Sequence, residues 1–254
     1  MGKIISLVNQ KGGVGKTTSS VNLSSALALK DYKCLVIDMD PQANASRAFN
    51  SQAEYPSIYE VLSEKVSIKD SLQKSDMDNL FLISSSLSLA GFNLEVLNRD
   101  SWEFCLKNKI ETLINEFDYI FIDCPPSLGP LTVNVLVASH QFIVPLQCEY
   151  YALEGLSQLI ETIQRVRANF NPNLKLQGIL LTMFDKRNKL SRQIEEEVRA
   201  HFEDKVFQTI VPRNVRLSEA PGFGKSIFQY DPRSLGAQTY YDLSSEFEKV
   251  ARLK

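Results

Sequence analysis

A glycine-rich loop near the start of the chain constrains its fold more than any other stretch. The loop runs from Asn9 to Thr18 and reads NQKGGVGKTT. The apolar, β-branched residues 4–8 before it indicate a buried strand, and the residues after it open a helix. Glycines let the backbone curl so that successive N–H groups point at one spot, beside the positive end of the helix dipole. This order of strand, loop, Lys-Thr and helix predicts a binding site for phosphate groups.

Individual residues of the loop have separate expected roles. We expect Lys16 to reach the β- and γ-phosphates of a nucleotide and the Thr17 hydroxyl to ligate Mg²⁺. The general pattern G-x-x-x-x-G-K-[ST] requires glycine where this chain has Gln10, and Lys11 is an additional lysine. Lys11 is either a solvated loop charge or a second phosphate-binding cation, which could reach across a dimer interface. The predicted phosphate-contacting residues are Lys11, Gly12, Gly13, Val14, Gly15, Lys16, Thr17 and Thr18.

Apolar runs rich in β-branched residues alternate with helix-length segments along the chain. The runs lack polar alternation, so we expect strands that are buried on both faces. The polar stretch 50–79 is predicted to form a short helix and loops. We predict an α/β fold in a single domain, 1–254, with a mostly parallel twisted sheet and helices on both faces. Strands are predicted at 4–8, 34–38, 80–83, 119–123, 142–146, 178–183 and 206–211, and helices at 17–30, 102–116, 153–169, 190–202 and 237–254.

Three aspartates follow predicted strands, at the edge of the sheet where α/β proteins place their functional groups. Asp40 can hold Mg²⁺ through water or orient an attacking water, and a turn or helix cap is its alternative role. Asp38 belongs either to the same region or to the fold, as a carboxylate bonded to loop amides. Asp123 ends the run 119–123 and is predicted to bind Mg²⁺ directly or through water. The predicted metal ligands are Thr17, Asp40 and Asp123, and the predicted catalytic residues are Lys11, Lys16 and Asp40.

Two basic loops follow predicted neighbouring strands in the second half of the chain. They contain Lys186 and Arg187 in the first loop and Arg213 and Arg216 in the second. Together they can form one patch for DNA phosphates, and the alternative is a solvated loop edge. Neither interleaved aromatic residues nor a helix-turn-helix accompanies them, so no sequence-specific reading of DNA is implied. The formal net charge of −2 argues against a globally basic nucleic-acid binder but not against a local patch.

The remaining features predict a cytoplasmic protein. The first residues run directly into the first strand without a signal peptide, and no apolar run approaches about 18 residues. The four cysteines show no C-x-x-C pairing and the two histidines are isolated, so a His/Cys metal site has no support. The predicted C-terminal helix carries Asp242, Glu246 and Glu248. We therefore expect this helix to pack on the sheet rather than to anchor the chain on a membrane.

Several motifs together resemble the ParA/MinD group of ATPases, which carry a deviant Walker A phosphate loop. They are KGGVGKTT at 11–18, DMDPQ at 38–42 and IDCPPS at 122–127. Two further stretches, QCEYYALEG at 147–155 and PRNVRLSEAP at 212–221, narrow the resemblance to chromosomal-type ParA, also called Soj. The resemblance runs from residue 1 to about 240, and the combination of motifs is highly specific.

The resemblance implies a P-loop NTPase fold and an ATPase that uses ATP and Mg²⁺. It further implies an ATP-dependent homodimer in which two subunits meet face to face around two nucleotides. In the family, the lysine matching Lys11 contacts phosphate of the opposite subunit. The glycine matching Gly12 lies where the subunits come close, and the aspartate matching Asp40 supports hydrolysis.

The resemblance also implies how the base and DNA are bound. Adenine contacts in the family come from the loops matching Thr182–Asp185 and Pro212–Asn214, so Pro212 and Asn214 are expected nucleotide contacts. The ATP dimer is expected to bind double-stranded DNA without sequence preference through residues matching Arg187 and Arg216. A centromere-binding partner of the ParB or Spo0J type is expected to stimulate a weak ATPase and release the dimer from the nucleoid.

Two other functions are alternatives. The first is a membrane-associated division-site ATPase of the MinD type, which requires a cationic amphipathic tail; residues 246–254 make a poor one. The second is a metabolic or metallocluster ATPase that uses the same loop. Its cluster-binding relatives need cysteines at the dimer face, and the four cysteines provide no such pair: Cys34, Cys105, Cys124 and Cys148.

Overall fold

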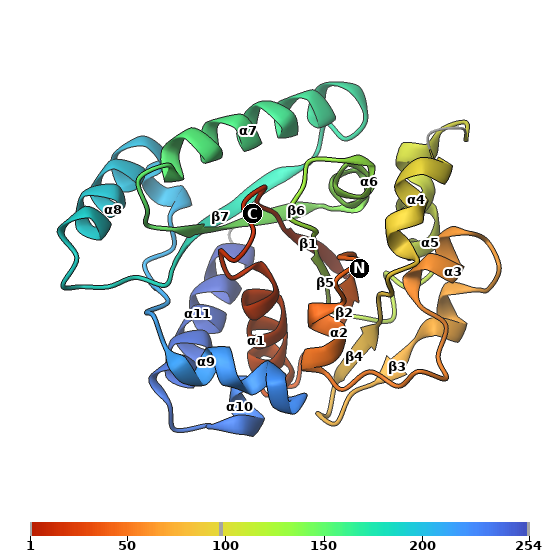
Figure 1. Ribbon diagram of the computed structural model, residues 1–254, viewed down its shortest axis with the longest axis horizontal. Helices are drawn as coiled ribbons and strands as arrows, with labels where there is room; N and C mark the ends of the chain where they lie inside the picture. The colour runs from red at the N-terminus through yellow and green to blue at the C-terminus, as the bar shows by residue number, and fades with distance from the viewer. Residues whose placement is uncertain (1, 97–98, 253–254) are drawn as a thin grey trace.

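The computed structural model describes residues 2–96 and 99–252. In this part of the chain seven strands form one sheet in the order β3-β4-β2-β5-β1-β6-β7 (Figure 1). Neighbouring strands run parallel, except for the antiparallel pair β3–β4 at one edge. The predicted, mostly parallel sheet is therefore confirmed. The strands are β1 (Lys3–Leu7), β2 (Cys34–Asp38), β3 (Gln73–Lys74), β4 (Leu80–Ile83), β5 (Tyr119–Asp123), β6 (Gln141–Gln147) and β7 (Lys175–Thr182).

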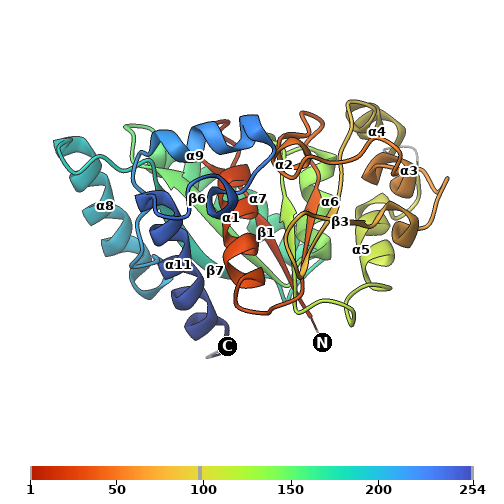
Figure 2. The same ribbon diagram turned by 90° about the horizontal axis from the view of Figure 1, so that it is seen from below.

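Helices cover both faces of the sheet, as predicted (Figures 1 and 2). In Figure 1, α1 and α11 lie below the sheet and α6, α7 and α8 lie above it. Figure 2 shows α2 and α9 along the upper edge, where β1 ends. The α-helices are α1 (Lys16–Ala28), α2 (Asn44–Ala48), α3 (Ile58–Leu62), α4 (Leu89–Glu95), α5 (Cys105–Ile110), α6 (Pro130–Ala138), α7 (Ala152–Asn169), α8 (Lys189–Phe202), α9 (Val215–Glu219), α10 (Ile227–Tyr230) and α11 (Leu235–Arg252). The 3₁₀ helices are η1 (Ile68–Ser71), η3 (Trp102–Phe104), η4 (Glu203–Lys205) and η5 (Ala220–Phe223).

Strand residues alternate between two apolar cores, one on each face of the sheet. In β1, Ile5 and Leu7 belong to the core that includes α1 and α11, whereas Ile4 belongs to the core beneath the opposite helices. In β5, Phe121 packs against Phe247 of α11, with ring centroids 6.0 Å apart. Because both faces of these strands are buried, their sequences are continuously apolar. This burial places the polar residues at the ends of the strands.

One predicted strand, 206–211, is wrong. The stretch makes an isolated bridge to β7 at Val206, and Phe207 and Val211 each donate one backbone N–H to β7, but no continuous ladder forms. The backbone N–H groups of Gln208 and Thr209 donate instead to the carboxylate of Glu246 in α11, at 2.6 and 2.9 Å. A side chain on a distant helix thus takes the donors that a strand would use.

Two other expectations need correction. The predicted helix 102–116 is shorter, because η3 and α5 end at Ile110 and the carbonyl of Ile114 accepts the N–H of Gly2 at 2.9 Å. That bond ties the residues after α5 to the start of the chain. The polar stretch 50–79 contains the predicted short helix, α3, but also the two-residue strand β3, which has no apolar signal.

The C-terminal helix α11 packs on the sheet, as predicted. Its side chains Tyr240, Leu243 and Phe247 are buried, so its apolar face belongs to the core. The predicted helix ran to 254, and residues 253–254 lie outside the described part of the chain. Across residues 2–96 and 99–252, no helix combines the length and apolarity needed to cross a membrane.

Candidate functional site

The loop between β1 and α1 has the backbone shape that a phosphate site requires. Gly13 and Gly15 have φ angles of 74° and 88°, in the left-handed region that favours glycine. Within residues 2–96 and 99–252, the backbone N–H groups of Gly12–Gly15 have no acceptor in the chain. Gly15 is also the N-cap of α1, so the positive end of the helix dipole points at the same place. A cluster of unpaired amides at a helix start fits the phosphates of a nucleotide.

Lys16 lies in the first turn of α1, beneath this loop, and is only 6% exposed. Its Nζ donates to the carbonyl oxygen of Lys11 at 3.0 Å. Burial lowers the pKa of Lys16, and the nearby carboxylate of Asp123 acts in the opposite direction. A buried ammonium beside unpaired amides gains from a bound phosphate, because the phosphate supplies both charge and acceptors.

Asp123 ends β5 directly beside the loop. Its two carboxylate oxygens accept bonds from Thr17 Oγ1 at 2.6 Å and from Ser20 Oγ at 3.1 Å. Burial raises the pKa of Asp123 to about 7, and the charge of Asp38 adds to this effect. The structure thus brings the predicted metal ligands Thr17 and Asp123 together. Hydroxyl and carboxylate oxygens are the donors that Mg²⁺ prefers, so the pair fits that ion.

Asp38 is the last residue of β2, Asp40 lies two residues further on, and the two carboxylates have different surroundings. Asp38 is fully buried, and its carboxylate accepts from Ser46 N at 2.8 Å, Ser46 Oγ at 2.7 Å and Asp40 N at 3.0 Å. Burial raises the pKa of Asp38 to about 6. Of its two predicted roles, the structure therefore matches the carboxylate bonded to loop amides.

Asp40 keeps both of its predicted roles open. Its Oδ1 accepts the N–H of Gln42 at 2.9 Å, which is the turn contact that was the alternative prediction. In the described part of the chain its other carboxylate oxygen has no partner. Asp40 also lines the cavity above the phosphate loop. The side chain can therefore hold the turn and still face a ligand.

Asp38→Ala is expected to lower the free energy of unfolding by roughly 3 kcal/mol, because three buried donors from Ser46 and Asp40 lose their acceptor. For a chain of this size the melting temperature falls by about 6–12 °C. Thermal unfolding followed by circular dichroism measures the effect. Asp78→Ala is the matched control, because the Asp78 side chain is 97% exposed. Equal melting temperatures for the two variants would contradict the structural role of Asp38.

The loop is joined to the region before and within α7. Lys11 forms an ion pair with Glu149, and the two side chains are 51% and 47% exposed. Gln10 Nε2 donates to the carbonyl of Gly155 at 3.3 Å and to Gln158 Oε1 at 2.9 Å. The departure from the general loop pattern at Gln10 therefore docks the loop on α7. Sequence reasoning missed both links, because each joins residues more than a hundred positions apart.

A cavity of about 600 Å³ opens above the phosphate loop. Thr17, Asp40 and Gly12 contribute to it, so the structure brings the predicted loop and the predicted carboxylate to one place. The cavity continues between α2 and η5, where Arg47 and Lys225 line it. Sequence reasoning did not single out these two cations, because neither stands in a recognisable motif.

A smaller cavity of about 160 Å³ lies alongside, and the two share Gly15 and Thr18 among their lining residues. Pro212 and Asn214 line this smaller cavity. The predicted base-contacting residues are thus placed next to the phosphate loop. Asn214 Oδ1 accepts the N–H groups of Arg216 and Leu217 at the start of α9, at 2.9 and 3.3 Å. Its position is therefore fixed by the helix that it caps.

The two predicted basic loops lie side by side, as expected. The N–H of Phe184 donates to Val211 O at 3.1 Å, and the N–H of Arg213 donates to Phe184 O at 3.2 Å. Lys186 and Arg213 are exposed, and the side chain of Arg187 is 91% exposed. Arg187 pairs with Asp185 of its own loop at 3.1 Å.

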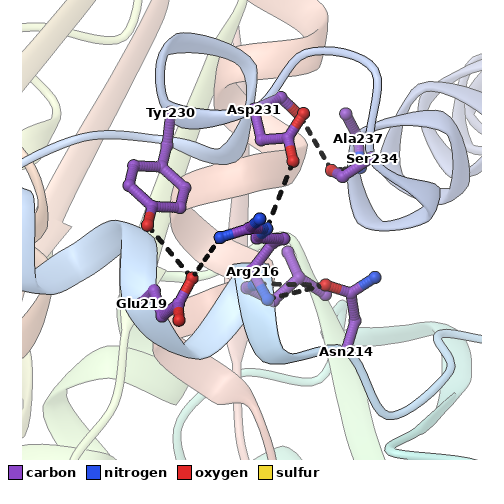
Figure 3. A network of polar contacts seen from close by, with 8 residues as sticks. Asn214, Arg216, Glu219, Tyr230, Asp231, Ser234 and Ala237 are labelled. Carbon is purple, nitrogen blue, oxygen red and sulfur yellow. Dashed lines mark hydrogen bonds and ion pairs between the residues drawn. The ribbon is translucent and has the colours of Figure 1, made fainter.

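Arg216, the fourth predicted cation, is more constrained than the other three. Figure 3 shows its guanidinium between Glu219 and Asp231, with Tyr230 donating to the same Glu219 carboxylate. Its side chain is 55% exposed. The structure thus places all four predicted cations on the surface, but Arg187 and Arg216 are already paired with carboxylates.

The chain is similar to known proteins over most of its length. The family described as AAA domain matches residues 2–176. The sporulation initiation inhibitor protein Soj of Bacillus subtilis (strain 168) is 48% identical over 248 residues, covering 97% of this chain and 98% of Soj. The chromosome partitioning protein ParA of Myxococcus xanthus is 48% identical over 251 residues, covering 98% and 89%.

One solved structure is similar throughout. It is the cobyrinic acid a,c-diamide synthase from Mycobacterium smegmatis with bound ADP and magnesium, with a TM-score of 0.86, 33% identity and coverage of 99% of this chain and 96% of the synthase. The partitioning relatives are more similar in sequence, at 48%. With its phosphate loop, its parallel sheet and these relatives, the chain belongs to the ParA/Soj family of partitioning ATPases.

Proposed function

We propose that this partitioning ATPase is an ATP-dependent switch for the segregation of a chromosome or plasmid, with residues 1–254 acting as one ATPase domain. Its ATP-bound dimer binds double-stranded DNA without sequence preference on the nucleoid. A ParB-type partner stimulates hydrolysis and thereby releases the dimer from DNA. The observation that carries this proposal is the phosphate loop, where unpaired amides, the buried Lys16 and the exposed Lys11 occur together. The ParA relative from Myxococcus xanthus, a chromosome partitioning protein, supports it.

ATP and Mg²⁺ are the ligands that the site fits. The amides of Gly12–Gly15 and the ammonium of Lys16 take the β- and γ-phosphates, and Thr17 with Asp123 holds the metal. Mg²⁺, when bound, draws negative charge from the phosphates. Pro212 and Asn214 take the base in the smaller cavity. The structurally similar synthase binds ADP and magnesium, which supports this assignment.

Hydrolysis uses the two lysines and Asp40. Lys16 neutralises the charge of the phosphates of its own subunit, while Asp40, with one carboxylate oxygen unpaired in the described residues, orients the attacking water. Lys11 acts on the nucleotide of the partner subunit. To do so it leaves Glu149, and a half-exposed ion pair of this kind costs only about 0–1 kcal/mol to break. A triphosphate carries more negative charge than one carboxylate and wins this competition.

Dimerisation gives the protein enough positive charge in one place to hold DNA. The chain as a whole has a formal net charge of −2, so one copy of the basic patch at Lys186, Arg187, Arg213 and Arg216 binds weakly. Two copies contact more phosphates and release more counterions, and the second contact is intramolecular. DNA binding therefore follows from ATP-dependent dimerisation.

Co-sedimentation with DNA tests the proposed function. The wild-type protein is expected to pellet with DNA in ATP but not in ADP or without nucleotide. Arg187→Ala should weaken retention about tenfold and flatten its dependence on salt, because one phosphate contact is lost in each subunit. Arg167→Ala on α7 is the matched control, since it removes an exposed arginine from another surface.

Three outcomes would count against the proposal. Equal retention in ATP and ADP would remove the switch, and equal loss in both arginine variants would place the DNA site elsewhere. Pelleting with liposomes in ATP, without DNA retention, would support the membrane-associated alternative of the MinD type. The burial of Tyr240, Leu243 and Phe247 argues against that alternative, since these apolar side chains of α11 pack on the sheet and are not available to a bilayer.

A further inference from the structure

Arg216, one of the cations that the proposed function assigns to DNA, is paired with two carboxylates of its own chain (Figure 3). Nη1 of Arg216 lies 3.0 Å from Oε2 of Glu219, and its Nε lies 3.4 Å from Oδ2 of Asp231. Glu219 stands one turn further along α9, and Asp231 follows α10. When all three groups are ionised, the cluster carries one net negative charge. Such a cluster repels a DNA phosphate until a carboxylate gives way.

The carboxylate of Glu219 is held in place for this contact. Tyr230 donates its hydroxyl to the same Oε2 atom at 3.0 Å. The ring of Tyr230 is in turn stacked on Phe223, with centroids 5.0 Å apart and ring planes 29° apart. The bonds from Arg216 and Tyr230 hold the pKa of Glu219 below its usual value, so the group is a carboxylate at neutral pH. The acceptor therefore stays charged and correctly oriented.

Each edge of the Arg216 guanidinium faces a carboxylate. A guanidinium offers two edges to a two-pronged acceptor such as phosphate, Nε with Nη2 and Nη1 with Nη2. Glu219 accepts a hydrogen bond from Nη1 of the second edge, and the carboxylate of Asp231 forms an ion pair with Nε of the first. A phosphate that engages either edge of Arg216 through two bonds therefore competes with one of these carboxylates.

We propose that Glu219, assisted by Asp231, competes with DNA for Arg216 and thereby sets how tightly the protein holds DNA. The inference rests on the proposed DNA binding and deepens it. The Glu219 and Asp231 side chains are 39% and 34% exposed, so each ion pair is a weak surface contact that DNA can replace. Replacement is favourable only when several phosphates are contacted together. The carboxylates thus hold a single subunit off DNA more effectively than a dimer.

Glu219→Gln tests the competition, because glutamine keeps the shape and one acceptor of the side chain but removes its charge. DNA retention in ATP is expected to tighten about three- to tenfold. This range reflects the loss of one surface ion pair that competes with DNA and the loss of repulsion between Glu219 and the DNA phosphate. Glu111→Gln makes the same change of charge at an exposed position just after α5 and should tighten binding less than about twofold. In an Arg216→Ala background, the gain from Glu219→Gln should fall to that control level.

A second variant tests the same competition without a change of charge, and melting temperatures control for an effect on folding. Tyr230→Phe removes the hydroxyl that fixes Glu219 without changing any charge, and it should tighten DNA binding about twofold. Melting temperatures equal to wild type show that both variants are folded. The inference is overturned if Glu219→Gln binds no tighter than Glu111→Gln, or if its gain is the same with and without Arg216.

The same series separates the inference from the proposed function. If wild-type protein retains no DNA in any nucleotide state, both fail. If Arg216→Ala binds DNA as wild type does, Arg216 is not a DNA contact and the inference fails with that assignment, while ATP-dependent DNA binding stands. If Arg216→Ala weakens retention but Glu219→Gln does not tighten it, only the competition fails.

Discussion

Gly12→Val is expected to leave nucleotide binding by the single chain intact and to abolish ATP-dependent dimerisation. A Cβ atom on Gly12 would meet nothing closer than the Cβ of Pro126 at 3.7 Å, an ordinary van der Waals distance. Unlike Gly13 and Gly15, Gly12 does not have a positive φ angle, so a side chain there strains no backbone. The valine therefore costs the single chain little. Its bulk acts where a second subunit would approach, beside the exposed Lys11.

The expected weakening of the dimer is at least about 100-fold, equivalent to about 3 kcal/mol, which is typical of overpacking in a close contact. Sedimentation velocity in ATP measures the dimer, and fluorescence of a labelled ATP analogue measures nucleotide binding. Gly91→Val on α4 is the control, because a Cβ there also meets nothing closer than 3.5 Å. A Gly12→Val protein that still dimerises in ATP would refute the proposed interface.

The parallel sheet was predictable because burial on both faces leaves a strong mark in the sequence. A strand such as β5 is apolar from Tyr119 to Ile122 and then ends in Asp123, so one run of residues indicates both the strand and its functional edge. The stretch 206–211 is also rich in apolar, β-branched residues but forms no strand. Two of its backbone donors, those of Gln208 and Thr209, go to Glu246, a residue some forty positions later, and local patterns carry no information about such a partner.

The phosphate site was predictable to the extent that it lies in adjacent strands. Because β1 pairs with β5 in parallel register, Leu7 stands beside Asp123, and the loop after β1 must meet that carboxylate. The distinction between Asp38 and Asp40 was not predictable. Both lie at the end of the same strand, and only the bonds from Ser46 to Asp38 show which one belongs to the fold.

The proposed DNA patch was likewise only partly predictable. The spacing of Arg216 and Glu219 by three residues in a helix is visible in the sequence and indicates an ion pair. The approach of Asp231 depends on the turn between α10 and α11, and no local spacing indicates it. Sequence patterns therefore identified the basic residues but not the carboxylates that oppose them.

Asp40→Ala is expected to bind ATP and DNA but to hydrolyse ATP about 10²- to 10⁴-fold more slowly, the usual range for loss of a group that positions or activates water. Because hydrolysis releases the dimer from DNA in the proposed cycle, the variant should stay on DNA as an ATP dimer. Phosphate release measures turnover, and filter retention after dilution into competitor DNA measures the lifetime of the complex.

The carboxylate of Asp40 also accepts the N–H of Gln42, so an effect of alanine has two explanations. Asp40→Asn separates them, because asparagine keeps an acceptor for that bond but removes the charge. If the charge orients water, the asparagine variant should hydrolyse ATP as slowly as the alanine variant and remain on DNA as long. Wild-type turnover in Asp40→Asn, with slow turnover in Asp40→Ala, would reduce Asp40 to the turn residue of its alternative role.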